Sequence, residues 1–177
     1  MCIRDRAVNI RGRSYTIAVG LTIETPEAEG VLFAHGGVGG GHSLFVKDGR
    51  AHYVYNWLGE RFQRVSADAE LSISKHVISA EFAKTGVDPD TQSSIGTLTL
   101  YVDDAPVAAT EIVTQPGFFA LTGDGLSVGR DSGSPVIPDY APPFEVAGGV
   151  IDRVIVDVSG EAYVDHEKEV LAYLKRD

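Results

Sequence analysis

Regular alternation of apolar and polar residues is the feature that most constrains this chain. In the stretch "SYTIAVGLTI", residues 14–23, every second residue from Tyr15 to Ile23 is large and apolar, and those between are small or polar. A period of two sustained over this length predicts a β-strand with one buried face. The same alternation returns in "HSLFVK", "AHYVYNWL", "LSISKHVISAEF", "IGTLTLYVD" and "GGVIDRVIVDV".

Turn-forming residues separate these stretches, at 26–30, 48–49, 86–92 and 103–106. Short strands divided in this way predict an all-β fold, an antiparallel β-sandwich, formed by residues 7–160. A short C-terminal helix is predicted for 161–177, because its acidic residues come early and Lys175 and Arg176 fall in the last turn, which suits the helix dipole.

The first six residues, "MCIRDR", are similar to a translated sequencing adapter, so we expect 1–6 to be an artefact and the chain to be the tail of a longer protein. Cys2 is the single cysteine, which excludes an internal disulfide. Residues 1–13 lack the apolar centre of a signal peptide, and no run reaches the roughly 20 apolar residues of a membrane span. No membrane partner is therefore expected.

The charge balance argues against a nucleic-acid partner. Lys and Arg number 15 against 25 Asp and Glu, which gives a formal net charge of -10. A surface of this sign repels phosphates instead of displacing their counterions.

The dipeptide Asp48-Gly49 allows the central hairpin to be derived residue by residue. A two-residue type I′ turn at this point pairs Lys47 with Arg50 and, further along, His42 with Tyr55. One face of the hairpin then carries Leu44, Val46, Tyr53, Tyr55 and Trp57, and the other carries Ser43, Phe45, Lys47, Arg50, His52, Val54 and Asn56. The first face is predicted to pack on the core.

Two candidate contact surfaces lie on this hairpin. The aromatic stripe of Tyr53, Tyr55 and Trp57 is either core packing, which its apolar neighbours favour, or a platform on which a sugar stacks. The opposite, mixed face is predicted to contact a partner through Phe45, His52, Val54 and Asn56.

The sequence predicts neither a metal site nor a pair of catalytic carboxylates. In the derived register His42 and His52 point to opposite faces, and no thiol or carboxylate stands at ligand spacing from them or from His35. The E-x-D-x-E pattern of sandwich glycanases does not occur. Asp88 and Asp90 are interpreted as solvated turn residues, with a weak Ca²⁺ loop as the alternative.

The loop "SVGRDSGSPV", residues 127–136, is similar to the nucleophile loop G-D-S-G-G-P of trypsin-like proteases. A nucleophilic serine needs a histidine base and an oxyanion hole. Arg130 and Ser134 replace glycines of the protease pattern, so Ser132 is not expected to be catalytic. A tight turn in which Gly129 and Gly133 adopt permissive dihedral angles is the preferred interpretation.

Three longer stretches resemble the C-terminal, non-catalytic region of the large bacterial arylsulfatases, a β-sandwich of concanavalin A-like lectin/glucanase type. They are 28–59, 96–108 and 126–158, and they share spaced words such as S-L-x-V-K-D-G, Y-x-Y-N, L-Y-V-D and G-R-D-x-G-x-P-V. The resemblance implies a concanavalin A-like jelly roll that packs, in cis, on an N-terminal sulfatase domain absent from this chain. It also implies a periplasmic or secreted parent.

No catalytic residue is carried over by this resemblance. The family hydrolyses sulfate esters with a formylglycine made from C/S-x-P-S-R beside a Ca²⁺, and neither the motif nor the metal ligands match any position here. The expected function is thus an accessory domain without catalytic residues or cofactors of its own. Arg130, Asp131 and Tyr140 are the predicted interdomain contacts, since charged side chains form directional contacts in a polar interface. A carbohydrate-binding, lectin-like module is the alternative.

Overall fold

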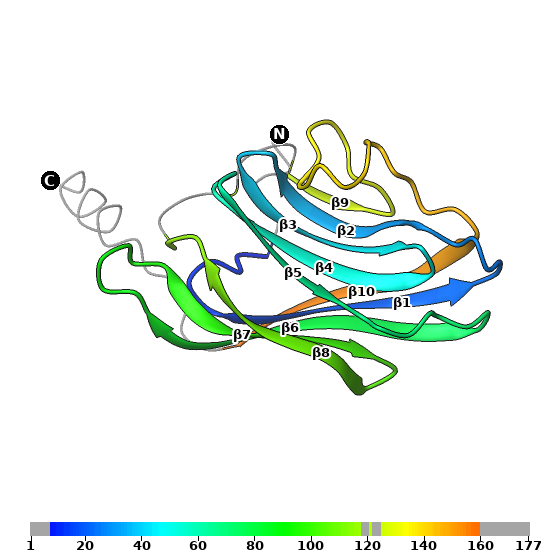
Figure 1. Ribbon diagram of the computed structural model, residues 1–177, viewed down its shortest axis with the longest axis horizontal. Coiled ribbons are helices and arrows are strands. Elements are labelled where there is room, and N and C mark those ends of the chain that lie inside the picture. The colour runs from blue at the N-terminus through cyan, green and yellow to red at the C-terminus, as the bar shows by residue number, and fades with distance from the viewer. Residues whose placement is uncertain (1–7, 118–120, 122–124, 160–177) are drawn as a thin grey trace, which may run out of the picture.

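The computed structural model describes residues 8–117, 121 and 125–159, which form two antiparallel five-stranded sheets packed face to face (Figure 1). Sheet I has the strand order β10 (Gly149–Ser159), β1 (Ser14–Ile23), β6 (Lys75–Val87), β7 (Ser94–Val102) and β8 (Ala105–Thr114). Sheet II has the order β5 (Arg61–Ser66), β4 (Arg50–Trp57), β3 (Gly40–Lys47), β2 (Gly30–Gly37) and β9 (Leu126–Val128). The predicted all-β sandwich is confirmed.

Two predicted segments, 1–6 and the helix at 161–177, lie outside the described residues. Within those described, no helix is long and apolar enough to cross a membrane.

The central hairpin has the register that the Asp48-Gly49 turn predicts. Lys47 pairs with Arg50 and His42 with Tyr55. Asp48 and Gly49 have φ angles of 50° and 70°, so both central residues adopt the positive φ of a type I′ turn. A two-residue turn therefore fixed which side chains of β3 and β4 face the core.

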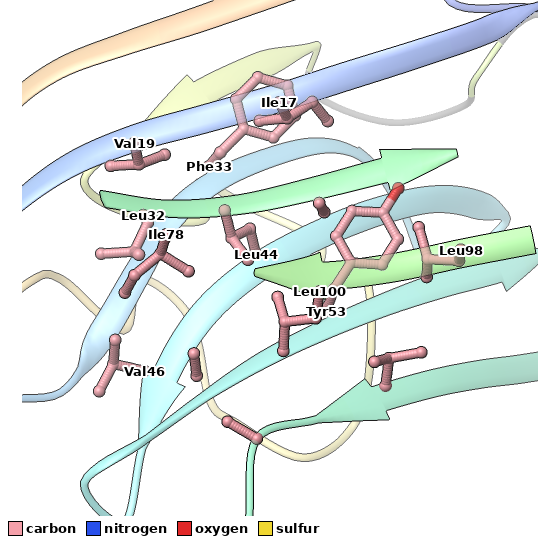
Figure 2. Packing of buried hydrophobic residues seen from close by; sticks show 14 of the residues in the cluster. Ile17, Val19, Leu32, Phe33, Leu44, Val46, Tyr53, Ile78, Leu98 and Leu100 are labelled. Atoms are coloured by element: carbon pink, nitrogen blue, oxygen red, sulfur yellow. The ribbon is translucent and has the colours of Figure 1, made fainter. Parts of the chain in front are cut away.

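The main core lies between the sheets and is built from the alternating residues of each strand. Figure 2 shows Ile17 and Val19 of β1 close to Leu32 and Phe33 of β2, with Leu44 and Tyr53 beside them. Tyr15 and Tyr53 meet across the two sheets, and their hydroxyl oxygens lie 2.7 Å apart. This hydrogen bond satisfies two polar groups in an otherwise apolar interior.

A second, smaller core lies on the outer face of sheet II. Residues 129–147, here called the strap and drawn in yellow and orange in Figure 1, cross this face. Val136, Ile137 and Tyr140 of the strap pack against the outward side chains of Val31, Ala34, Phe45 and Val54. Strands β2 and β3 are consequently buried on both faces.

The strap corrects the prediction that the mixed hairpin face contacts a partner. Phe45, Val54 and Asn56 are at most 2% exposed, because the chain's own strap covers them. Of the four predicted contact residues, His52 keeps partial exposure.

The Tyr15–Tyr53 hydrogen bond gives a first test. Tyr15→Phe leaves the Tyr53 hydroxyl buried without this partner, so we expect the free energy of unfolding to fall by about 1–3 kcal/mol in urea denaturation. The double variant Tyr15→Phe/Tyr53→Phe should lose less than the sum of the two single variants. Tyr101→Phe, which removes a hydroxyl near the surface, is the control and should shift stability by under about 0.5 kcal/mol. Strict additivity of the two single effects would contradict the assignment.

Candidate functional site

A cleft of about 360 Å³ opens at the end of the sandwich where β1 terminates, on the right in Figure 1. Its lining comes from the β1–β2 loop, the β3–β4 turn and the segment after β5, and consists of Pro26, Glu27, Ala28, Glu29, Asp48, Gly49 and Glu70. This volume is within the range of small-molecule sites. Three separate segments thus form one surface.

Backbone hydrogen bonds hold the cleft segments together. Leu71 N–H donates to the carbonyl of Gly49 over 2.7 Å, which places Glu70 beside the β3–β4 turn. Glu29 exchanges a pair of hydrogen bonds with Ala147 at the end of the strap, 3.1 and 2.9 Å long. Gly30 follows with φ +129°, and a Cβ there would lie 2.5 Å from the Cα of Val146. Only glycine allows the strap to approach β2 this closely.

The cleft is acidic and solvated. Glu27, Glu29, Asp48 and Glu70 are all exposed, and Arg50 stands on the rim with its Nη2 3.9 Å from Oε1 of Glu70. Ionised carboxylates only accept hydrogen bonds, so the cleft suits a ligand that brings several hydroxyl or ammonium donors. An anionic ligand would be repelled.

No cluster of three or more potential metal ligands occurs among the residues described. Asp88 and Asp90 lie in the loop for which the sequence leaves a weak Ca²⁺ site as the alternative to a solvated turn. There, Asp88 Oδ1 accepts the backbone N–H groups of Asp90 and Thr91, each at 2.9 Å. These two hydrogen bonds lower the pKa of Asp88 and identify it as a turn-capping residue.

Two of the three predicted interdomain contacts instead anchor the strap. Asp131 is 2% exposed, and its Oδ2 accepts the Val136 N–H at 3.0 Å and the Tyr140 hydroxyl at 2.7 Å. The Tyr140 oxygen also lies 3.0 Å from Ser43 Oγ on β3. Asp131 and Tyr140 are therefore buried within this chain, which corrects their predicted role. Arg130 stays exposed beside Glu145, with 3.6 Å between the charged atoms.

Asn56, in the last part of β4, joins the strap to two turns. Its Nδ2 lies 2.9–3.1 Å from the carbonyl oxygens of Gly37, Val38 and Val136, and its Oδ1 accepts the Gly59 N–H at 2.9 Å. The side chain is fully buried, and both of its polar atoms have hydrogen-bond partners.

The aromatic stripe divides between core and surface. Tyr53 and Tyr55 are 0% and 2% exposed, which confirms core packing and leaves neither ring a face for a sugar. Trp57 is partly exposed, and its Nε1 donates to Ser93 Oγ over 3.4 Å. Trp57 lies at the opposite end of β4 from the acidic cleft.

His42 is fully buried on the core face of β3, and both of its ring nitrogens lack a hydrogen-bond partner. It is packed among the aromatic rings of Tyr15, Phe33, Tyr53 and Tyr55, and beside His35, whose ring centroid is 5.8 Å away. Burial, and secondarily the charge of His35, lowers the pKa of His42 well below its usual range. The ring is therefore neutral in the folded protein.

A serine, a histidine and a carboxylate do meet, but at a place the sequence did not indicate. Ser74 Oγ lies 3.1 Å from His76 Nε2, and Asp103 Oδ2 lies 2.7 Å from Nδ1. The nearest atom to Nε2 is the carbonyl oxygen of Ser72 at 2.9 Å, which can only accept. The backbone carbonyl therefore lies closer to Nε2 than Ser74 Oγ does, and it competes for the ring position from which a general base would act on the serine. The cluster ties the start of β6 to the β7–β8 turn.

The loop around Ser132 has the turn geometry that its glycines predict. Gly129 and Gly133 have φ angles of 75° and 82°. The loop begins the strap, and its pattern G-R-D-x-G-x-P-V contains Asp131 and Val136, the two residues whose hydrogen bond closes the turn.

Sequence reasoning missed the acidic cleft. It recognised 26–30 and 48–49 as turns, yet the proximity of Glu29, Asp48 and Glu70 depends on how three loops meet at one end of the sandwich. No local pattern carries that signal.

Comparisons with known proteins identify the fold. No protein-family model and no curated protein matches the sequence. Among solved structures, domains LG4-5 of the mouse laminin α1 chain align with a TM-score of 0.57 and 16% identity, over 87% of this chain and 38% of that chain. The CBM40 of Ruminococcus gnavus IT-sialidase, bound to α2,3 sialyllactose, aligns with a TM-score of 0.52 and 14% identity, over 91% of this chain and 82% of that one.

The receptor binding domain of botulinum neurotoxin D is also similar, with a TM-score of 0.54 and 8% identity over 96% of this chain and 39% of that chain. The chain thus spans well under half of the laminin and neurotoxin structures and most of the sialidase module. These likenesses show the fold, an antiparallel β-sandwich of the concanavalin A-like type.

His42 gives the second test, a pH dependence of stability. In the unfolded chain histidine titrates near pH 6.5, whereas the folded protein keeps His42 neutral to a lower pH. Below about pH 6.5 the unfolded state binds the extra proton, so the free energy of unfolding should fall by up to about 1.4 kcal/mol per pH unit. Urea denaturation at pH 7, 6 and 5 should show a smaller loss for His42→Phe than for the wild type. Tyr15→Phe, which alters the same cluster but leaves His42 in place, should lose stability in parallel with the wild type; equal losses in all three proteins would contradict this role.

Proposed function

We propose that this chain is a non-catalytic, carbohydrate-binding module that holds a glycan in the acidic cleft between 26–29, Asp48 and Glu70. The observation that carries the proposal is the cleft itself, a concave surface rich in hydrogen-bond acceptors on a lectin-like sandwich. The likeness to the sialidase CBM40 supports it, since that module binds sialyllactose and the two chains correspond over most of their lengths.

The chemistry of the lining narrows the ligand class. Glu27, Glu29, Asp48 and Glu70 offer carboxylate oxygens to sugar hydroxyls, while Pro26 and Ala28 offer apolar contact to sugar C–H groups. Four carboxylates on a chain of net charge -10 repel acidic sugars. Neutral or amino sugars are therefore the proposed ligands, unlike the sialylated ligand of CBM40.

The second candidate function is an accessory domain of an arylsulfatase, and the sequence words shared with that family favour it. Two of these words, Y-x-Y-N and G-R-D-x-G-x-P-V, contain Asn56 and Val136, whose hydrogen bond joins sheet II to the strap, and Asp131, which closes the turn of the strap. Arg130 is the exposed residue of the strap loop that this function assigns to the interdomain contact.

A glycan array followed by calorimetry tests the carbohydrate proposal. Glu29→Gln and Glu70→Gln keep the size of the side chain and remove its charge, so each should weaken binding of a neutral or amino sugar about tenfold, because hydrogen bonds to a charged group are about twice as strong as neutral ones. Glu111→Gln, an equally exposed change on β8, is the matched control and should leave affinity unchanged.

Trp57 fluorescence distinguishes the two ends of the sandwich. Binding in the cleft should leave the emission of Trp57 unshifted because that ring lies at the other end of β4. A blue shift of the Trp57 emission, together with wild-type affinity in the Glu29 and Glu70 variants, would indicate that the glycan binds at Trp57. That result would contradict binding in the cleft. The absence of binding to every glycan of a broad array would contradict the proposed carbohydrate binding.

The reading frame upstream of this segment in an intact genome tests the sulfatase candidate. A continuous frame that encodes C/S-x-P-S-R is expected if the segment belongs to an arylsulfatase, and Arg130→Ala in that enzyme should then lower its thermal stability or activity. An in-frame stop codon directly upstream would contradict the parentage.

A further inference from the structure

The lateral sides of the sandwich differ from each other. On the side formed by β5 and β8, the Gln63 side chain closes the gap: its Nε2 donates to the Val113 carbonyl over 2.7 Å and its Oε1 accepts the Val113 N–H over 2.8 Å. A side-chain amide thus occupies part of the β8 edge. On the side formed by β10 and β9, no described strand pairs with the outer edge of β10.

The open side exposes residues that belong to the core face. Ile17 and Val19 of β1 are 0% exposed, whereas the core-facing residues of β10 next to them remain only partly buried. On β9, Leu126 and Val128 are 42% and 44% exposed although they pair with His35 and the core residue Phe33. The seam between the two edges is defined by these side chains: Leu126, Val128, Ile151, Val154, Val156 and Val158.

The outer face of β10 carries a self-complementary pattern of charge. Arg153, Ile155 and Asp157 alternate along the strand and are all exposed. Neither Arg153 nor Asp157 has an ion-pair partner among the described residues, while the adjacent Asp152 accepts a hydrogen bond from Thr22 Oγ1 at 3.1 Å.

From this pattern we infer that β10 pairs with β10 of a second copy of this chain, antiparallel and centred on Ile155. In this register Ile155 faces Ile155 of the other copy, and Arg153 faces Asp157 on each side of the two-fold axis. Val154 and Val156 face each other on the core side, which covers part of the seam. Opposite charges and apolar pairs directly across two strands are the favourable cross-strand combinations.

The neighbouring registers are less favourable. Centring on Val154 sets Arg153 against Ile155, and centring on Val156 sets Asp157 against Ile155, so each puts a charge against an apolar residue. Centring between two residues pairs a core-facing side chain with an outward one, which the two-residue period of a strand forbids. Of these registers, the one centred on Ile155 pairs apolar residues with each other on both faces and sets each Arg153 against an Asp157.

Charge exchange tests this pairing in the full chain. Sedimentation velocity over a concentration series should show a monomer–dimer equilibrium. Arg153→Asp and Asp157→Arg each replace two attractive pairs by two repulsive ones and should weaken the dimer at least about tenfold. The double variant R153D/D157R restores both pairs and should return the dissociation constant to within about threefold of the wild type.

Lys75→Asp, the same change of charge at an exposed position on β6, is the matched control and should leave the dimer unchanged. A wild-type chain that stays monomeric up to about 1 mM, or a double variant no stronger than the single ones, would overturn the inference.

Disulfide trapping provides a second readout that does not depend on affinity. In a Cys2→Ser background, Ile155→Cys should form a disulfide-linked dimer under mild oxidation, because residue 155 alone opposes its own copy in this register. Val150→Cys, exposed on the same strand, should crosslink far more slowly. Equal rates at the two positions would overturn the register. Because these measurements involve no sugar, their outcome is independent of the proposed glycan binding.

Discussion

The buried carboxylate of Asp131 is the constraint on which the outer half of the structure depends. A carboxyl group at 2% exposure is costly to bury without hydrogen bonds, and the Val136 N–H and the Tyr140 hydroxyl both donate to its Oδ2. Asp131 and both donors belong to the strap, so these hydrogen bonds fix the shape of the strap and the position of Tyr140, which contacts sheet II. Tyr140 then reaches Ser43, and its ring meets Phe45 edge-on with 5.3 Å between centroids.

Double burial of sheet II explains why some of the fold was predictable and some was not. The alternation around Tyr15 and the turn at Asp48-Gly49 act locally, and they gave the strands and the register of β3 and β4. The sequence predicts that Phe45 and Val54 lie on an exposed, mixed face, because nothing near them in the sequence indicates what covers them. The covering residues, Val136 and Tyr140, lie over eighty positions later in the chain.

The same distinction applies to the predicted site residues. The sequence predicts one interdomain role for the adjacent residues Arg130 and Asp131, yet Asp131 is buried within the strap and Arg130 is exposed. Exposure is set by the tertiary contacts of the loop, which its composition does not encode. The acidic cleft was out of reach for a related reason, because Glu29, Asp48 and Glu70 share a surface but no local pattern.

The core occupies both inner faces and the strap occupies the outer face of sheet II, so the two proposed binding surfaces lie elsewhere, at the loop end and along the β10 edge. These two surfaces are linked: Ala147, two residues before β10, pairs with Glu29 of the cleft. In an antiparallel pair centred on Ile155, the two β10 strands begin at opposite ends. With about 3.3 Å per residue, their first residues lie about 40 Å apart. The two clefts of the proposed dimer would therefore lie at opposite ends, an arrangement that suits the bridging of two glycans and not the clasping of one.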